Sequence, residues 1–262
     1  MRRFLSKKSL VDITSFILLL VVLTYLLIRG GGSLGYRWQW YRVLDYIFQF
    51  EDGNFIVGPL LKGLLITFRI TFFSLILTLL FGLTTALMRL SDSFVARVVS
   101  RVYLEMIRNT PLLVQIFFIY FVLAPVLGLN RFFSAVIALS LFEGAYASEI
   151  FRAGIVSISK GQWEAASSLG LKMYHTYRYV ILPQAVRRML PPLTSQAISL
   201  IKDSALVSTI AIYDLTMEGQ VIISDTFLTF EIWFTIAGMY LIITISLSMV
   251  VNVMEHRLKV VN

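Results

Sequence analysis

The chain has 262 residues, 58% of them hydrophobic, and its mean hydropathy of +0.80 excludes an ordinary soluble domain. It has no cysteine, which excludes disulfides and thiol chemistry, and His175 and His256 lie too far apart for a local metal motif. The net charge of +8 does not indicate nucleic acid as a partner, because the basic residues cluster beside apolar runs. These features predict an all-α, polytopic membrane protein.

The N-terminus combines a basic start with an apolar run at 13–29. Such a start is typical of a signal peptide, but no A-x-A cleavage site follows, so we expect an uncleaved first span, with cleavage as the alternative. The next segment, 30–59, is rich in Trp and Tyr and fits an interfacial helix or aromatic belt. We therefore expect an accessory N-terminal part, 1–54, followed by the main membrane domain, 55–262.

Five further spans follow the first in hydropathy, at 60–88, 103–124, 132–152, 193–214 and 232–254. Pro111 is expected to start or kink a helix, and the run after it is too short to cross a membrane alone. The span at 193–214 is weakly apolar. It is retained because its polar residues recur at helical spacing on one stripe, namely Ser195, Gln196, Ser199, Lys202 and Asp203.

Six spans place both termini in the cytoplasm, as the positions of Lys and Arg require. The outer loop, 215–231, contains acidic residues and no Lys or Arg. The loop at 155–190 is then the longest cytoplasmic connection.

This cytoplasmic loop is predicted to form a short, two-part helical knob. A helix at 162–169 follows the turn residue Gly161, and Glu164 lies near its start, where the helix dipole favours a negative charge. Gly170 is expected to end this helix. A second helical stretch, 171–181, is expected to end or bend at Pro183.

The loop resembles the signature of ABC importer permease subunits. It contains Glu-Ala-Ala, then Gly after three residues, then a hydrophobic residue and Leu-Pro: Glu164, Ala165, Ala166, Gly170, Val180, Leu182 and Pro183. Val180 replaces the isoleucine usual in the family. The resemblance implies the fold of a type I ABC importer transmembrane domain in a bacterial cytoplasmic membrane. The coupling residues it implies are Glu164, Ala165, Ala166, Gly170, Leu182 and Pro183.

The same resemblance implies several partners. These are a cytoplasmic ABC ATPase dimer, a second permease subunit (identical or homologous), an external amino acid-binding protein and membrane lipid. The chain has no P-loop motif and is therefore expected to be no enzyme and to hold no cofactor itself. ATP and magnesium would bind to the ATPase.

Three stretches are similar to permeases for polar amino acids: "RNTPLLVQ" (108–115), "EGAYASEIFRAGI" (143–155) and "LPQAVRRMLPPLTSQAISLIKDSALVS" (182–208). The resemblance covers about 55–257. It favours glutamate, aspartate or their amides as substrate, with Lys202 as a partner for a side-chain carboxylate.

Polar residues inside spans are costly and usually face a polar interior. The candidate substrate pathway therefore comprises Gln115, Glu143, Tyr146, Glu149, Gln196, Ser199, Lys202 and Asp203. The alternative is that Glu149–Arg152 and Lys202–Asp203 are ion pairs that only hold helices together. Arg108 and Arg152 are expected to be structural.

Two other functions compete with the importer. Glu143, Glu149 and Asp203 would suit an ion-coupled secondary transporter, but no inverted repeat is visible. A membrane-embedded enzyme is the third possibility, although no HExxH or G-x-S-x-G motif is present.

Overall fold

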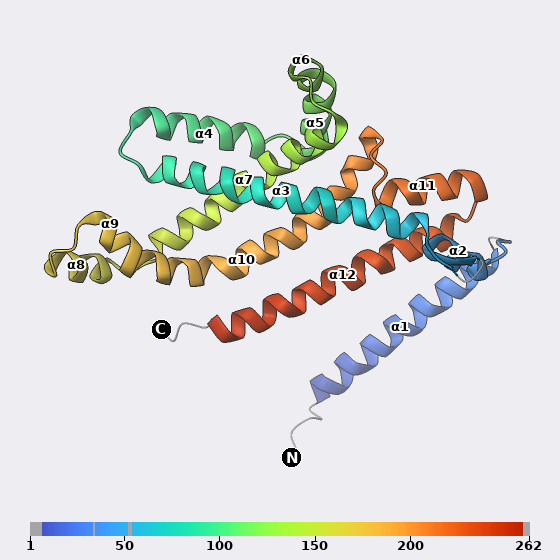
Figure 1. Ribbon diagram of the computed structural model, residues 1–262. Coiled ribbons are helices and arrows are strands. Elements are labelled where there is room, and N and C mark those ends of the chain that lie inside the picture. Colours follow the sequence, from blue (N-terminus) through green and yellow to red (C-terminus); the bar gives the residue numbers. More distant parts are fainter. Residues whose placement is uncertain (1–6, 34, 52–53, 259–262) are drawn as a thin grey trace. The chain divides into compact units, whose positions relative to one another are not determined.

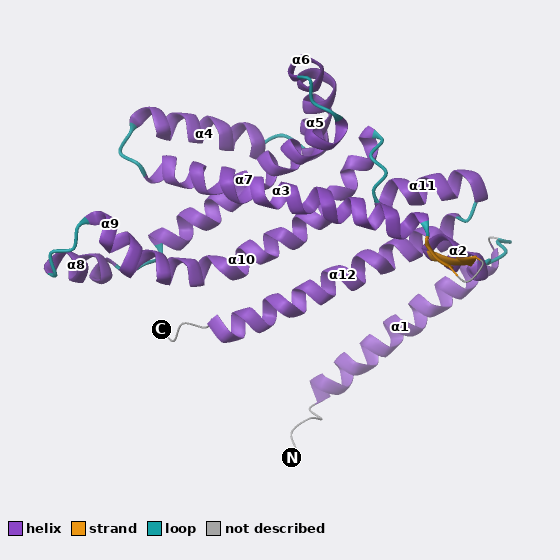
Figure 2. Cartoon of the chain, viewed as in Figure 1, coloured by secondary structure: helices purple, strands orange, loops and turns teal. Residues whose placement is uncertain are grey.

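The computed structural model describes residues 7–33, 35–51 and 54–258, and these are almost entirely helical (Figures 1 and 2). The chain forms two compact units, one up to Tyr41 and one from Arg42 onward. The first unit contains α1 (Lys7–Ser33) and a stacked pair of rings, Trp38 and Trp40, whose centroids lie 5.9 Å apart. The 27 residues of α1 measure about 40 Å. Its described apolar part, Asp12–Val22, is shorter than a span, so the first span and the boundary at 54 remain predictions.

The second unit begins with a short helix and a hairpin. A 3-10 turn, η1 (Trp40–Arg42), leads into α2 (Val43–Ile47), and β1 (Phe48–Glu51) pairs with β2 (Asn54–Val57) in antiparallel register. The hairpin is orange in Figure 2. The sequence prediction for 30–59 missed these strands, although Phe48 to Glu51 alternate aromatic and polar residues, a strand period.

Three long apolar helices confirm three predicted spans. They are α3 (Pro59–Leu90), α7 (Arg131–Val156) and α12 (Thr229–Leu258). By length and apolarity, the described part of the chain contains these three candidate spans, or up to five if each of two bent helix pairs crosses as one. The count of six spans therefore remains a prediction.

Helices α3 and α7 lie side by side at the centre of this unit (Figure 1). A Cβ atom added at Gly82 of α3 would lie only 2.8 Å from the Cβ of Ala147 on α7. Ser140 Oγ also donates a hydrogen bond to the backbone oxygen of Ser74 across the seam, at 3.1 Å. Small residues and such hydrogen bonds are what allow helices to associate closely in a lipid environment.

The predicted span at 103–124 consists of two sharply bent halves, and whether they cross the membrane as one span stays a prediction. Helix α4 (Phe94–Arg108) is followed by α5 (Leu112–Phe117), a π-helical turn η2 (Phe118–Leu123) and α6 (Ala124–Leu127). The chain bends by 108° between α4 and the segment 112–127. The break at Pro111 is confirmed. Proline disfavours a helical conformation in the preceding residue, and Gln115 Nε2 stabilises the break by donating to Ile107 O at 2.8 Å and Thr110 O at 3.0 Å.

The second helical stretch was predicted to end or bend at Pro183, and it does not end there. Helix α8 (Lys160–Ser168) is followed by α9 (Met173–His175), a π-helical turn η3 (Thr176–Ile181), α10 (Leu182–Asp203) and a 3-10 segment η4 (Ser204–Ile210). Pro183 lies in the first turn of α10, directly after the widened turn in which Leu182 N–H donates to Tyr177 O. The wide turn accommodates the proline, so the expected span at 193–214 belongs to a helix that starts much earlier.

A further helix, α11 (Leu215–Thr226), occupies most of the predicted outer loop at 215–231. The side chain of Asp214 caps it by accepting a hydrogen bond from Met217 N–H at 2.9 Å. Leu215 and Ile222 pack against Leu228 and Ile232 at the start of α12. The sequence prediction missed α11 because its polar residues concealed this apolar contact face.

Candidate coupling and transport sites

Helix α8 confirms the predicted first part of the knob, and its end is closed as expected. Gly170 has a φ of +70°, in the left-handed region that favours glycine. Gly170 N–H donates to Ser167 O at 2.9 Å, and Leu171 N–H donates to Ala166 O at 3.1 Å. These bonds satisfy carbonyls that the helix end would otherwise leave free.

The six candidate coupling residues divide between an outward and an inward face. Ala166 is only 2% exposed, so it packs against the protein. The other five are exposed: Glu164, Ala165, Gly170, Leu182 and Pro183. Leu169, next to the cap, is 79% exposed, so the outward face offers an apolar residue beside a carboxylate.

The two parts of the knob contact each other, and the first part also contacts α10. Trp163 of α8 meets the ring of Tyr177 edge to face, with centroids 5.2 Å apart. Gln184 Nε2 on α10 donates to Gln162 Oε1 at 3.1 Å. In Figure 1, α8 and α9 lie beside the first part of α10. The knob and the start of α10 are therefore linked by a side-chain hydrogen bond.

A second group of polar residues lies between α7 and α10. Glu143 of α7 is 1% exposed and accepts a hydrogen bond from Gln196 Nε2 of α10. Its Oε1 atom has no hydrogen-bond partner among the described residues. Asp203 and Lys202 also act on this carboxyl group electrostatically. The structure thus brings together four of the predicted pathway residues, namely Glu143, Gln196, Lys202 and Asp203. Ser199 lies on α10 between Gln196 and Lys202.

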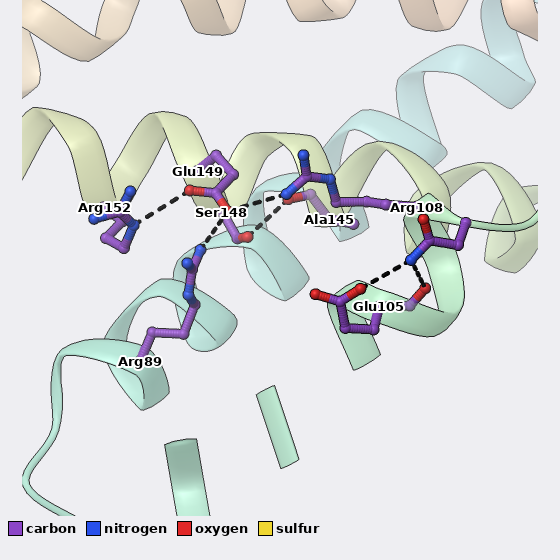
Figure 3. A network of polar contacts seen from close by, with 8 residues as sticks. Arg89, Glu105, Arg108, Ala145, Ser148, Glu149 and Arg152 are labelled. Carbon is purple, nitrogen blue, oxygen red and sulfur yellow. Dashed lines mark hydrogen bonds and ion pairs between the residues drawn. The ribbon is translucent and has the colours of Figure 1, made fainter. Parts of the chain in front are cut away.

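Glu149 forms a different arrangement, shown in Figure 3. Its Oε1 atom accepts from Arg89 NH1 at 2.7 Å and Arg108 NH1 at 3.3 Å, and its Oε2 atom accepts from Arg152 Nε at 3.2 Å. The proposed Glu149–Arg152 pair is confirmed, and Arg108 contacts the same carboxylate. Arg89 was missed because it lies 60 residues from Glu149 and no local spacing indicates the contact.

The remaining candidates lie in local contacts. The Arg108 guanidinium lies 5.9 Å from the ring centre of Tyr146, and the amide nitrogen of Gln115 is bound to the α4–α5 break. No Lys202–Asp203 ion pair forms in the described part of the chain. Whether any of these residues contacts substrate stays a prediction.

Comparison with known proteins identifies relatives over most of the chain. Residues 78–260 match the family model "Binding-protein-dependent transport system inner membrane component". The glutamine transport system permease protein GlnP of Escherichia coli (strain K12) is 42% identical over 204 residues, covering 77% of this chain and 93% of that protein. The L-cystine transport system permease protein TcyB of Bacillus subtilis (strain 168) is 45% identical over 206 residues, covering 76% and 87%.

The solved structures that resemble this chain are also ABC transporters. One, described as a crystal structure of an amino acid ABC transporter with histidines, has a TM-score of 0.76 at 36% identity and covers 85% of this chain and 100% of its own. A chain of the MetNI methionine ABC transporter in an inward-facing conformation has a TM-score of 0.64 at 17% identity, which shows the shared fold, and covers 77% and 96%. The chain therefore belongs to the family of binding-protein-dependent transport system inner membrane components, as an amino acid ABC importer permease with a type I transmembrane fold.

Proposed function

We propose that the chain forms half of the translocation pathway of an ATP-driven importer for a polar amino acid. Residues 162–183 dock on a partner ATPase, which binds the ATP and magnesium, and both termini lie in the cytoplasm. A second permease subunit completes the pathway, and an external binding protein delivers the substrate. The observation that carries this proposal is the buried carboxylate of Glu143, which has a free oxygen and lies at the seam with the helix that bears the knob.

The chemistry around Glu143 suits a zwitterion. The carboxylates of Glu143 and Asp203 are acceptors for an ammonium group, and Lys202 is a donor for a carboxylate. Gln196 and Ser199 add neutral donors and acceptors for a polar side chain.

Glutamine is the substrate to test first. The sequence favoured acidic amino acids or their amides, but the relatives are named for glutamine and cystine, which gives the acidic substrates no support.

The test is uptake of labelled glutamine into proteoliposomes that contain the permease, its ATPase and its binding protein. We expect uptake to require ATP inside the vesicle, and glutamate to compete weakly. Uptake that follows a proton or sodium gradient without ATP would instead establish a secondary transporter.

Neutralising the buried carboxylate tests the site itself. Glu143→Gln is expected to reduce uptake at least tenfold, while Tyr213→Phe, a conservative change at an exposed residue outside the cluster, leaves it unchanged. Normal uptake in Glu143→Gln would remove this carboxylate from the substrate pathway without affecting the requirement for ATP.

A further inference from the structure

Helix α4 has three distinct faces, which follow from its 100° rotation per residue. One face packs on the protein: Ser100 and Leu104 are buried, and Tyr103 Oη donates to Leu141 O of α7 at 2.6 Å. A second face is basic. The third is apolar and exposed, and it consists of Val95, Val98, Val99, Val102 and Met106.

The basic face of α4 lines a polar cavity of about 350 Å³. Five arginines line this cavity: Arg89, Arg97, Arg101, Arg108 and Arg152. Glu105 and Glu149 are the acidic residues of its lining, so five positive and two negative charges leave an excess of three positive charges. We call it the basic cavity, and its lining carries a net positive charge.

The internal ion pairs do not use all the donors. Glu149 already accepts from three of the arginines (Figure 3). Arg97 donates only to the backbone oxygen of Ser91, at 3.0 Å, and Arg101 has no hydrogen bond or ion pair with any described residue. Because each guanidinium has five N–H donors, a bound anion would find several of them free.

We propose that this basic cavity binds the headgroup of an anionic phospholipid, whose acyl chains lie along the exposed apolar face of α4. A free phosphate would use the arginines but leave the valines and Met106 in contact with water. A neutral lipid would cover the apolar face but leave the positive charge unbalanced. An anionic lipid provides a negatively charged headgroup for the basic face and acyl chains for the apolar face. The two faces adjoin each other on the helix.

The location fits the cytoplasmic leaflet, an assignment that rests on the proposed orientation. Arg89 ends α3, and Arg97 lies in the first turns of α4, so the cavity is at the end of the unit where α3 turns back into α4 (Figure 1). Positively charged residues at this end of a membrane protein face the anionic leaflet.

The test is lipid retention, measured separately from transport. The permease complex is placed in nanodiscs of equal parts phosphatidylglycerol and phosphatidylcholine, released, and analysed by native mass spectrometry. We expect the wild type to retain phosphatidylglycerol preferentially. Arg97→Gln with Arg101→Gln should lower this preference about tenfold, because each basic residue near the surface adds to the attraction.

Arg187→Gln with Arg188→Gln is the matched control, because it removes two exposed arginines outside the cavity. It should keep the preference. Equal retention of the two lipids by the wild type would overturn the proposal without any variant. An unchanged preference for phosphatidylglycerol in the Arg97 and Arg101 variant would also overturn the proposal.

Two further measurements distinguish other occupants. Displacement of phosphatidylglycerol by millimolar inorganic phosphate would show a site for free anions and overturn the lipid assignment. Because the chain has no cysteine, Val99→Cys introduces a single thiol. A disulfide between two copies through this thiol would show that a second permease covers the apolar face, whereas labelling by a lipid-phase maleimide supports the proposal.

Discussion

Gln196 of α10 donates a hydrogen bond to the buried carboxylate of Glu143 on α7, across 53 positions of sequence. The bond joins the helix at the centre of the unit to the helix that carries the knob. Because Glu143 is 1% exposed, water does not readily replace this donor if α10 moves. The carboxylate therefore depends on the relative position of the two helices.

Exchanging these two residues separates packing from charge. Gln196→Leu should lower the free energy of unfolding by about 1–3 kcal/mol, since it removes the donor of a buried carboxylate. The exchange Glu143→Gln with Gln196→Glu restores an amide–carboxylate pair and should recover the thermal midpoint in detergent. It moves the carboxyl group to α10, so stimulation of ATP hydrolysis by substrate should stay low. Recovery of both properties would mean that the pair is only structural.

The three arginines around Glu149 predict a ranked effect on stability. Glu149→Gln should cost about 1–2 kcal/mol, a modest value because its side chain is 30% exposed. Arg89 makes the shortest contact, at 2.7 Å, and is 25% exposed, whereas Arg108 is 46% exposed at 3.3 Å. Arg89→Gln should therefore lower the thermal midpoint more than Arg108→Gln. The reverse order would contradict this ranking of the contacts.

The two glycines of the knob provide a matched pair. A Cβ atom would meet no other atom within 4 Å at Gly161 or at Gly170, but only Gly170 has a positive φ. Gly170→Ala should destabilise the end of α8 by about 1 kcal/mol, whereas Gly161→Ala should be neutral or slightly stabilising in the helix. Hydrogen exchange of the peptide covering 160–175 checks this, and equal exchange in both variants would show that the cap is unimportant.

The proposed coupling role of α8 predicts a loss of ATPase binding when the charge of Glu164 is reversed. Glu164 is exposed, so Glu164→Lys should leave the fold intact and reduce co-purification of the ATPase about tenfold or more. Asp225→Lys makes the same change at an exposed residue of α11 and serves as the control. If both variants retain the ATPase equally, the docking surface lies elsewhere.

The sequence predicted the elements that depend on local signals. Hydropathy located α3, α7 and α12 because each is long and apolar, and the Gly170 cap followed from a single residue type. The effects of the prolines were predicted only in part. Pro111 produces a sharper break than a kink, while Pro183 lies within a helix because a π-helical turn precedes it.

The contacts of the candidate sites also divide into those with a local sequence signal and those that arise only from tertiary packing. Glu149–Arg152 was predicted because the two residues are three positions apart on one helix. Arg89 was not, because its contact arises from the packing of α3 against α7 and has no sequence signal of its own. The Glu143–Gln196 bond likewise needs the tertiary structure, although both residues were selected as costly polar groups within spans.

The helical segment from Met173 to Ile210 has a mechanical consequence. Tyr177 lies in this segment and contacts Trp163 of α8. It is separated from Gln196 by about 28 Å along the helix axis. Pro191 and Pro192 lie between them and remove two backbone N–H donors, which makes this the most compliant part of the rod. We expect bending at these prolines to take up small displacements of the knob, so that only large displacements reach Gln196. Replacing both prolines with alanine should stiffen the rod, and we expect ATP hydrolysis by the partner to rise in the absence of substrate.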